Sequence, residues 1–447
     1  MRKSKQPQDL VRTKDFDTAL HAMEHGSPFV FVTGRAGTGK STLLRHFRNQ
    51  GKLRCVILAP TGVAALNVEG ETIHRFFRFG PDVTVRDAKK KGAAAADDQL
   101  YQAVDVIVVD EISMVRADLF DAMDAFLRAA RRTQSPFGGV RVVVIGDLFQ
   151  LPPVLGSEEA ADYARLYATP FFFGSTAFQD LVARREVTFV ELERVFRQAD
   201  PRFVDILNAV RDRTADATHL ETLRQRVGVA HKDAIVLTST NAAADEINQR
   251  KLAALPGKAV GYTGTAQGVF GEKEMPTSHQ IVLVPGARVM FVANDPEGRY
   301  VNGTVGTVRT CEPKRVVVET DDEEWIDVEP HTWTLYRSSF DAKHQSLKQE
   351  KIGSFTQIPL RLAWAVTIHK SQGKTFDRVH IDLGRGAFAS GQTYVGLSRA
   401  RSLEGLTLAK PVERRHILVD ETVVTFFKEL PGMLKDGAKK GATKSMF

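Results

Sequence analysis

The 447-residue sequence is poor in cysteine and has no long apolar run. Cys55 and Cys311 are its two cysteines, and neither has a histidine spaced to complete a metal site. Buried free thiols are the simpler interpretation, and they suit a reducing compartment such as the cytoplasm. No stretch of about 18 apolar residues occurs, and residues 1–6 are basic without the apolar segment of a secretion signal. The sequence therefore predicts a cytoplasmic protein with no membrane segment.

The composition is that of an ordinary globular chain. Hydrophobic residues make up 43% of the sequence and charged residues 26%. At roughly 100 to 200 residues per domain, the length allows about two to four domains. The formal net charge is +7 and the pI is near 9.2, which favours a polyanionic partner. Charge alone is weak evidence, because many basic proteins bind no polyanion.

Residues 34–41, GRAGTGKS, fill every fixed position of the phosphate-binding pattern G-x-x-x-x-G-K-[ST]. A buried strand is predicted before this loop, over residues 29–33, and a helix after it, from Thr42. The glycines let backbone N–H groups turn towards a phosphate at a helix N-terminus, Lys40 reaches the β- and γ-phosphates, and Ser41 holds Mg²⁺. A plain glycine-rich turn is the weak alternative. The predicted cradle consists of Gly34, Ala36, Gly37, Thr38, Gly39, Lys40, Ser41 and Thr42.

Polar side chains follow two further apolar runs. Asp110 and Glu111 come directly after residues 104–109, a run typical of a buried parallel strand, whose carboxyl end is where ligands bind. Asp110 is predicted to hold Mg²⁺ through a water and Glu111 to act as general base towards the attacking water. Gln150 follows the next such run and suits a γ-phosphate sensor, because its amide both donates and accepts. A polar turn before two prolines explains Gln150 equally well.

The combination of motifs resembles the Pif family of DNA helicases, in superfamily one beside the RecD and Dda types. The segment over residues 117–139, ending PFGG, resembles the one that separates Pif helicases from those relatives. The resemblance covers well over three quarters of the chain, and it implies two RecA-like lobes with ATP between them and single-stranded DNA across their top, moving 5′-to-3′. The matching segments are residues 59–65 (APTGVAA), 72–77 (TIHRFF), 110–114 (DEISM), 146–153 (GDLFQLPP), 195–198 (VFRQ), 367–373 (TIHKSQG) and 394–400 (YVGLSRA).

Further site residues follow from the resemblance, position by position. Arg197 and Arg399 look like the arginine fingers that a second lobe points at the γ-phosphate, and Gly373 is similar to a nucleotide-binding position. Outside the family, each arginine is more typical of a surface salt bridge. Core packing is an equal alternative for Phe76. The DNA-binding residues implied are Pro60, Thr61, Thr72, His74, Phe76, Asn241, Thr367, His369, Lys370 and Ser371.

The sequence departs from the family pattern at three places. Where relatives carry a glutamine that reads adenine, the nearest residues are Phe16 and Asp17, and an ionised aspartate cannot donate to adenine N7. We therefore expect recognition of the triphosphate rather than of the base. Gly396 stands where relatives have alanine, with little effect expected. Residues 78–99 form a short charged, alanine-rich insertion that has no aromatic wedge for splitting a duplex.

The predicted fold is α/β, with two RecA-like P-loop lobes built on parallel sheets. The first lobe spans residues 1–187 with the insertion at 78–99, and the second spans 188–284 and 356–430, opening with a strand at 189–192. A small SH3-like β-barrel is predicted at 285–355 and a basic flexible tail at 431–447.

The function predicted is an ATP- and Mg²⁺-dependent helicase that moves 5′-to-3′ on single-stranded DNA and unwinds tailed or forked duplexes as a monomer. One alternative is a translocase that strips proteins from DNA without strong unwinding, and RNA is not excluded as its track. Another is a P-loop switch that acts on a protein partner, which should lack arginines reaching across from a second lobe.

Overall fold

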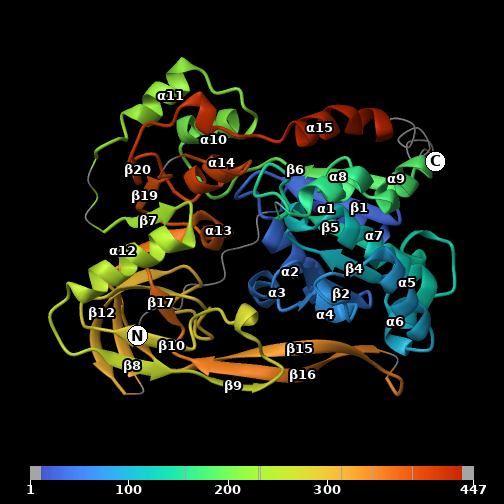
Figure 1. Cartoon of the computed structure of the whole chain (residues 1–447), viewed down its shortest axis with the longest axis horizontal. Helices are drawn as coiled ribbons and strands as arrows, with labels where there is room; N and C mark the ends of the chain where they lie inside the picture. The colour runs from blue at the N-terminus through green and yellow to red at the C-terminus, as the bar shows by residue number, and fades with distance from the viewer. Residues whose placement is uncertain are drawn as a thin grey trace.

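The computed structural model describes residues 12–434 except positions 157, 230, 232, 314, 345 and 385. Two α/β lobes lie side by side, and a β-rich body lies below the second lobe (Figure 1). Within these described ranges no helix is both long and apolar enough to cross a membrane. The predictions for residues 1–11 and 435–447 fall outside the described residues.

The first lobe is built on a six-stranded parallel sheet in the order β3-β2-β4-β5-β1-β6. Alternate residues of β1 enter opposite cores: Phe29 and Phe31 face one, and Val30 and Val32 face the other. Because both faces are covered, the strands carry short continuous apolar runs. The strands are β1 (Phe29–Gly34), β2 (Cys55–Ala59), β3 (Glu71–Thr72), β4 (Val106–Val109), β5 (Arg141–Ile145) and β6 (Val187–Leu192).

The strand β6 corrects the predicted domain boundary. We expected residues 189–192 to open the second lobe, but β6 pairs in parallel with β1 along its full length, from Phe29 opposite Val187 to Gly34 opposite Leu192. A short apolar run indicates a buried strand but not which sheet it joins. The first lobe therefore extends through Leu192, and the segment carrying Arg197 connects the two lobes.

Helices and 3₁₀ turns cover both faces of the first sheet. α1 and α2 pack on one face, and most of the others pack on the opposite face. They are α1 (Lys14–His25), α2 (Lys40–Gln50), α3 (Gly62–Asn67), α4 (Ile73–Phe76), α5 (Val85–Ala94), α6 (Gln99–Ala103), η1 (Ile112–Met114), α7 (Ala117–Ala130), η2 (Pro136–Gly139), α8 (Ala160–Leu166), η3 (Phe172–Gly174) and α9 (Thr176–Ala183).

The predicted insertion at residues 78–99 is packed tightly into the first lobe. Its helix α5 lies against α7, and Ala88 is fully buried in the same core as Phe126. Gly92 allows the close approach, because a Cβ there would lie 2.2 Å from the Phe126 carbonyl oxygen. Thr84 begins the helix by accepting a hydrogen bond from the Asp87 N–H. The segment is thus part of the lobe's core.

The second lobe has a four-stranded parallel sheet in the order β18-β7-β19-β20. One face of this sheet packs against helices in a common hydrophobic core. The strands are β7 (Ile235–Thr238), β18 (Ala365–Thr367), β19 (Val379–Asp382) and β20 (Leu406–Leu408). The helices and turn are α10 (Pro201–Arg211), α11 (Ala217–Arg224), α12 (Asn241–Ala253), α13 (Ile368–Ser371), α14 (Gln392–Leu397) and η5 (Arg414–His416).

The β-rich body is larger than the barrel predicted at residues 285–355. A five-stranded antiparallel sheet shares one hydrophobic core with a two-stranded sheet. The two-stranded sheet begins at Val260, and the last strand of the five-stranded sheet ends at Leu362. An SH3-like barrel stays a prediction. The strands of these two sheets are β8 (Val260–Thr263), β10 (Gln280–Leu283), β11 (Arg288–Phe291), β12 (Val305–Glu312), β13 (Arg315–Thr320), β14 (Trp325–Val328) and β17 (Leu360–Leu362), with η4 (Glu272–Glu274) between the first two.

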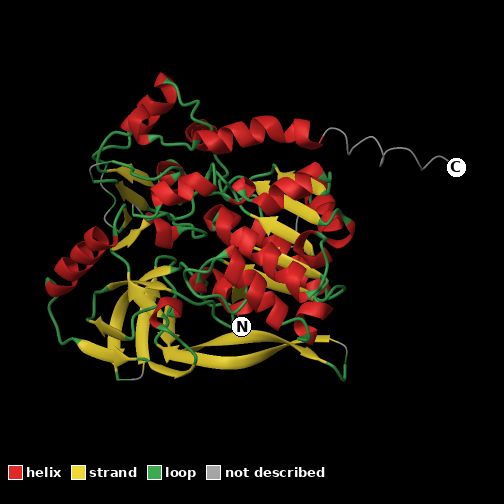
Figure 2. Ribbon diagram, turned by 45° about the vertical axis from the view of Figure 1, so that its right-hand side comes forward, coloured by secondary structure: helices red, strands yellow, loops and turns green. Residues whose placement is uncertain are grey.

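A long hairpin reaches from the β-rich body to the first lobe. It consists of β15 (His331–Asp341) and β16 (Ser346–Gln357), with β9 (Thr265–Gly268) paired to β16. Both views show it running beneath the first lobe (Figures 1 and 2). At the contact the Ser338 N–H donates to the buried Glu71 carboxylate of β3 at 2.5 Å. Burial raises the pKa of Glu71.

The last helix corrects a second boundary. We assigned residues up to 430 to the second lobe and the rest to a flexible tail, but α15 (Glu421–Leu434) crosses from the second lobe onto the first (Figure 1). Phe426 stacks on Phe173 with ring centroids 4.3 Å apart, and Phe427 stacks on Phe149 at 5.3 Å. Residues 431–434 are therefore helical, and α15 completes the aromatic core of the first lobe.

Candidate nucleotide cleft and nucleic-acid groove

A cleft of about 470 Å³ lies between the two lobes and contains most of the predicted nucleotide-binding residues. The first lobe provides the phosphate-binding loop and the carboxyl ends of β4 and β5, and the second lobe provides the opposite wall. The lining is Ala36, Gly37, Thr38, Gly39, Lys40, Ser41, Thr42, Asp110, Glu111, Gly146, Gln150, Phe196, Arg197, Gly373, Thr375, Arg399 and Arg401. All five predicted catalytic residues and both predicted metal ligands are in this set, while their roles stay predictions.

The loop backbone explains its glycines. Gly37 and Gly39 have φ angles of 84° and 91°, which side chains rarely permit, and Gly39 caps α2 in the left-handed conformation. A Cβ on Gly37 would lie 2.5 Å from the Cβ of Arg197, so glycine also lets the connecting segment approach. The Phe196 N–H donates to the Gly37 carbonyl at 2.8 Å. The loop and the segment carrying Arg197 therefore form one unit.

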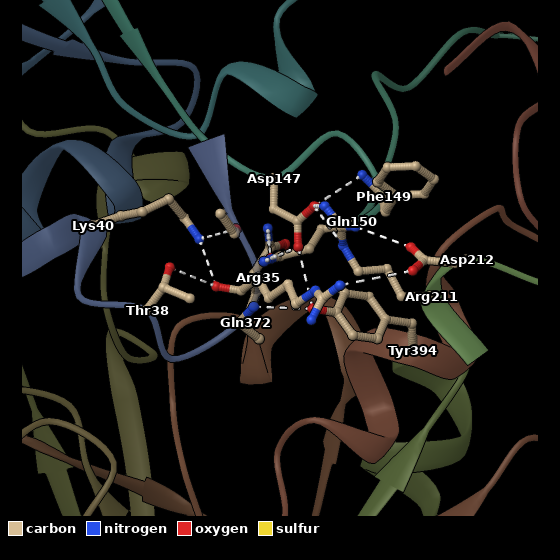
Figure 3. Close-up of polar contacts among 12 residues, drawn as sticks. Arg35, Thr38, Lys40, Asp147, Phe149, Gln150, Arg211, Asp212, Gln372 and Tyr394 are labelled. Atoms are coloured by element: carbon tan, nitrogen blue, oxygen red, sulfur yellow. Dashed lines mark hydrogen bonds and ion pairs between the residues drawn. The ribbon is translucent and has the colours of Figure 1, made fainter. Parts of the chain in front are cut away.

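Lys40 lies at the centre of this loop. Its ammonium donates to the carbonyl oxygens of Gly34 at 2.6 Å and Arg35 at 3.0 Å (Figure 3). Burial lowers its pKa, although Asp147 and Glu111 partly offset that effect. Gly34, the one predicted cradle residue outside the cleft lining, thus contacts Lys40 directly. A phosphate entering the cleft would meet a cation held at the helix N-terminus.

Asp110 and Glu111 follow β4, as the sequence predicts. Glu111 has a φ of 51°, a conformation that is strained for a residue with a side chain and is often found at functional sites. Burial raises the pKa of both carboxyls, and the neighbouring Glu111 charge raises that of Asp110 further. A buried carboxyl beside the Ser41 hydroxyl in one cleft suits a divalent cation, because carboxylate and hydroxyl oxygens are ligands that Mg²⁺ prefers.

Arg197 of the connecting segment and Arg399 of the second lobe lie close together in the cleft. Arg399 is 1% exposed, and its guanidinium donates to the carbonyls of Val395 at 2.8 Å and Lys374 at 3.0 Å. Arg197 donates to the carbonyl of Gly373 at 3.3 Å. In the described part of the chain neither arginine forms an ion pair, and burial with the other arginine's charge lowers the pKa of Arg399 to about 9. Two adjacent, unpaired guanidiniums create a site for an anion.

A buried polar network that sequence reasoning missed connects the lobes. Asp147, which follows β5, accepts from Arg211 of α10 at 3.1 Å and from the Tyr394 hydroxyl of α14 at 3.2 Å (Figure 3). That hydroxyl accepts in turn from the Ala36 N–H of the phosphate-binding loop at 2.9 Å. Burial alone would raise the pKa of Asp147, but Arg211 and Lys40 hold it below its usual value.

A groove of about 670 Å³ adjoins the cleft, with Glu111 lining both cavities. The first lobe contributes Thr61, and α13 with the turn after it contributes His369, Lys370, Gln372 and Lys374. The β-rich body adds residues that the sequence did not predict: His279, His331, Trp333 and Arg361. Their only sequence signal was their aromatic or cationic character, which packing explains equally well. The groove offers cations for phosphates and rings for bases.

The structure brings together only some of the predicted DNA-binding residues. Thr61, His369 and Lys370 line the groove. Exposed Asn241 and half-buried Pro60, Thr72 and His74 lie at or just beyond the carboxyl ends of strands β2, β3 and β7 but outside the groove lining.

Three other predicted contacts are buried. Phe76 is 3% exposed and packs edge-on against Phe77 and Tyr101, so core packing is the correct interpretation of its ring. Thr367 caps the α13 backbone by accepting from the Lys370 N–H, and the Ser371 hydroxyl donates to the Ile368 carbonyl. Their side chains therefore shape the turn at α13.

The cleft lining includes an aromatic ring that sequence reasoning missed. Phe196 is 47% exposed, lines the cleft and lies 3.9 Å from where a Cβ on Gly39 would stand. Asp17, placed where relatives read adenine, instead accepts a hydrogen bond from Arg12 at 2.6 Å. The exposed ring face at the cleft is thus the feature suited to a base.

Comparison with known proteins agrees with this architecture. A family model described as PIF1-like helicase matches residues 12–218. The chain is 34% identical over 427 residues to the ATP-dependent DNA helicase Pif1 of Bdellovibrio bacteriovorus, which covers 93% of this chain and 91% of that protein. The chain belongs to the PIF1-like helicase family. The ATP-dependent DNA helicase PIF1 of Danio rerio is 33% identical over 446 residues, or 94% of this chain.

The vertebrate relatives are longer than this chain, and the solved Pif1 structures superpose on it to different degrees. The chain spans about three fifths of the length of the vertebrate PIF1 proteins that it matches. Unliganded Pif1 from Bacteroides sp. superposes with a TM-score of 0.83 at 34% identity, over 94% of this chain and 97% of that one. Bacteroides Pif1 bound to single-stranded DNA gives 0.67 at the same identity, over 95% and 98%. The match confirms the two-lobed α/β fold.

Proposed function

We propose that this chain is an ATP- and Mg²⁺-dependent helicase that moves 5′-to-3′ on single-stranded DNA and unwinds tailed or forked duplexes. One observation carries the proposal: the cleft that joins a complete phosphate-binding loop to two arginines of the opposite wall shares Glu111 with a cationic, aromatic groove. The proposed site of ATP hydrolysis and the proposed DNA-binding groove thus share the Glu111 side chain.

ATP hydrolysis follows from the cleft residues. Water attacks the γ-phosphorus, the bond to the β–γ bridging oxygen breaks, and Glu111 takes the water's proton as ADP leaves. Lys40, Arg197 and Arg399 stabilise the charge on the transferring phosphoryl, and an arginine finger contributes about 10³ to 10⁵ in rate in related enzymes. Ser41 and Asp110 would hold Mg²⁺, which would supply neutralising charge at the phosphates. Phe196 provides a ring for the base.

Substrate class follows from the groove. A protein-binding switch has no need of ring faces beside basic side chains next to its catalytic base, whereas single-stranded nucleic acid binds through phosphate contacts and base stacking. Two relatives in the comparisons are named as DNA helicases. We therefore propose DNA as the track, with RNA and protein displacement as the alternative outcomes of the test.

A single chain contains both halves of the proposed active site. Lys40 and Glu111 lie on the first lobe, and Arg399 on the second lobe of the same chain is held by its own backbone carbonyls. Hydrolysis therefore requires no residue from a second copy, and we propose that the monomer is the catalytic unit.

The test is a strand-displacement assay with forked, 5′-tailed and 3′-tailed duplexes, each made in DNA and in RNA. ATP-dependent release from forked and 5′-tailed DNA is expected, with little from 3′-tailed DNA. Release from 3′-tailed DNA alone would contradict the polarity, and preference for RNA duplexes would contradict the track. Binding to single-stranded DNA should weaken steeply with salt, because phosphate contacts dominate such interfaces. An ATPase rate that does not change when oligonucleotide is added would contradict the whole proposal.

Variants of the cleft separate hydrolysis from DNA binding. Lys40→Ala and Glu111→Gln should each lower ATP turnover at least about 100-fold, as removal of a charge-stabilising or proton-accepting group does, while oligonucleotide affinity stays within about threefold. The matched control is Lys52→Ala, which removes an exposed lysine just beyond α2 that pairs with Glu24. Turnover equal to wild type in Lys40→Ala would sink the assignment of this loop.

A further inference from the structure

The Gln372 side chain bridges two predicted catalytic residues of the first lobe. Its amide nitrogen donates to Glu111 Oε2 at 3.0 Å and to Gln150 Oε1 at 3.1 Å. Figure 3 shows Gln372 reaching Gln150 from the second lobe. The reverse amide orientation would place its oxygen against the Glu111 carboxylate, so the chemistry fixes the nitrogen at this position.

The bridge joins the ends of two neighbouring strands of the first lobe to one turn of the second lobe. Glu111 follows β4 and Gln150 follows β5, whereas Gln372 begins the turn after α13. Helix α13 carries His369 and Lys370 into the groove, and the turn that follows carries Lys374 there. Its opposite side faces the cleft through Gly373 and Thr375. Anything that shifts the turn from the groove side therefore moves the donor that holds Glu111.

We propose that Gln372 is a positioning residue through which DNA in the groove orients Glu111 and Gln150 for ATP hydrolysis. The inference rests on the proposed helicase function, and it assigns the coupling between DNA binding and ATP hydrolysis to one side chain. DNA phosphates that contact His369 and Lys370 fix the turn, and the fixed amide then holds Oε2 of Glu111. The other carboxylate oxygen is left to take the proton of the attacking water.

The bridge acts on turnover more than on binding. Gln372 lines the groove and not the nucleotide cleft, so it is not expected to contact ATP itself. Removing a hydrogen bond to a charged group, and with it the orientation of a general base, is expected to lower kcat about 10- to 100-fold. The KM for ATP and the affinity for single-stranded DNA should each stay within about threefold, since both ligands keep their direct contacts.

The experiment compares DNA-stimulated ATPase kinetics of wild type, Gln372→Ala, Gln372→Met and Gln372→Glu. Methionine keeps the length without a donor, and glutamate keeps the shape but repels Glu111, so neither is expected to restore kcat. Gln349→Ala is the matched control: this glutamine donates to the Glu69 carbonyl at 3.3 Å, also between domains, and itself lines neither the cleft nor the groove. It should keep the wild-type kcat.

A double-mutant cycle distinguishes positioning from general damage. Because one amide holds both partners, Gln150→Ala and Gln372→Ala should combine to less than the product of their separate effects on kcat. Multiplying effects would mean that the two glutamines act independently, which overturns the proposal. A Gln372→Met enzyme with wild-type kcat would also overturn the proposal. The same holds if its DNA-free rate rises to the stimulated level, because the bridge would then inhibit hydrolysis.

The same data separate this inference from the proposed function. If wild type shows no stimulation by DNA, the helicase proposal fails before any variant is considered. If wild type is stimulated and unwinds duplexes while the Gln372 variants behave like it, the proposed function stands and the bridge alone is wrong.

Discussion

Lys374 is a groove residue whose protonation is strongly altered by its surroundings. It lines the groove and donates to the Asn302 side chain. Burial and the nearby Arg361 charge lower its pKa from the ordinary 10.5 to about 7. The amine is therefore largely neutral in the free protein above pH 7, although a lysine is counted as a positive charge when only the sequence is considered.

This shift predicts that DNA binding weakens as pH rises. A DNA phosphate favours the charged ammonium, so binding takes up a proton whenever the free protein holds a neutral amine. The affinity should then fall from pH 6.5 to 9, by about tenfold for each unit by which DNA raises the pKa of Lys374. Burial lowers the pKa of His369 and His331 from 6.5, so these histidines stay neutral across that range.

The measurement is oligonucleotide affinity at fixed ionic strength across that pH range. Lys374→Arg keeps its charge at every pH and should show a flat profile. A wild-type profile that matches Lys374→Arg would contradict the prediction.

At the scale of elements, sequence patterns located strands better than they located contacts between elements. Short apolar runs correctly predicted β1, β4 and β5, because strands buried on both faces must be apolar throughout. The charged, alanine-rich segment at residues 78–99 was predicted only as a small insertion, since alanine and glycine give little hydrophobic signal. In the structure those small residues are what allow α5 to lie directly against α7.

Gly92 tests that contact. In an exposed helix a Gly→Ala change stabilises by up to about 1 kcal/mol. At Gly92 the new Cβ would lie 2.2 Å from the Phe126 carbonyl oxygen, so Gly92→Ala should destabilise the protein by about 1 to 3 kcal/mol through overpacking. Gly432→Ala in α15, with no atom within 4 Å of the new Cβ, is the control and should be neutral or stabilising. Chemical denaturation of both variants measures the difference, and a stabilised Gly92→Ala would show that α5 moves freely.

At the scale of the whole molecule, the buried Asp147–Arg211 pair links the lobes beside the active site. Arg211 is 5% exposed and Asp147 1%, and Arg211 also lies 4.1 Å above the Phe149 ring. Phe149 stacks in turn on Phe427 of α15. The charge pair and the last helix thus hold the same segment, the one that carries Gln150.

Arg211→Ala should therefore destabilise the protein by about 3 to 5 kcal/mol, because it leaves the Asp147 carboxylate buried without its partner. Loss of the lobe contact should lower ATP turnover as well. Thermal unfolding and ATPase assays measure both effects. Arg213→Ala, two residues on, removes an exposed pair with Glu421 and should change stability by less than about 1 kcal/mol. Equal effects of the two variants would show that burial of the pair is unimportant.

The sequence by itself determined the local chemistry of this protein. A phosphate-binding loop, two acids after a strand and the α/β alternation depend on residue type and near-neighbour spacing, and each is present where it was predicted. The tertiary structure decided which sheet β6 joins, that Phe76 is core, that α15 returns to the first lobe, and that Gln372, Tyr394 and Arg211 meet residues more than 60 positions away. The physical reason is that hydrophobic patterns indicate burial without naming a partner, whereas hydrogen bonds and ion pairs between lobes require the folded chain to bring distant groups within about 3 Å.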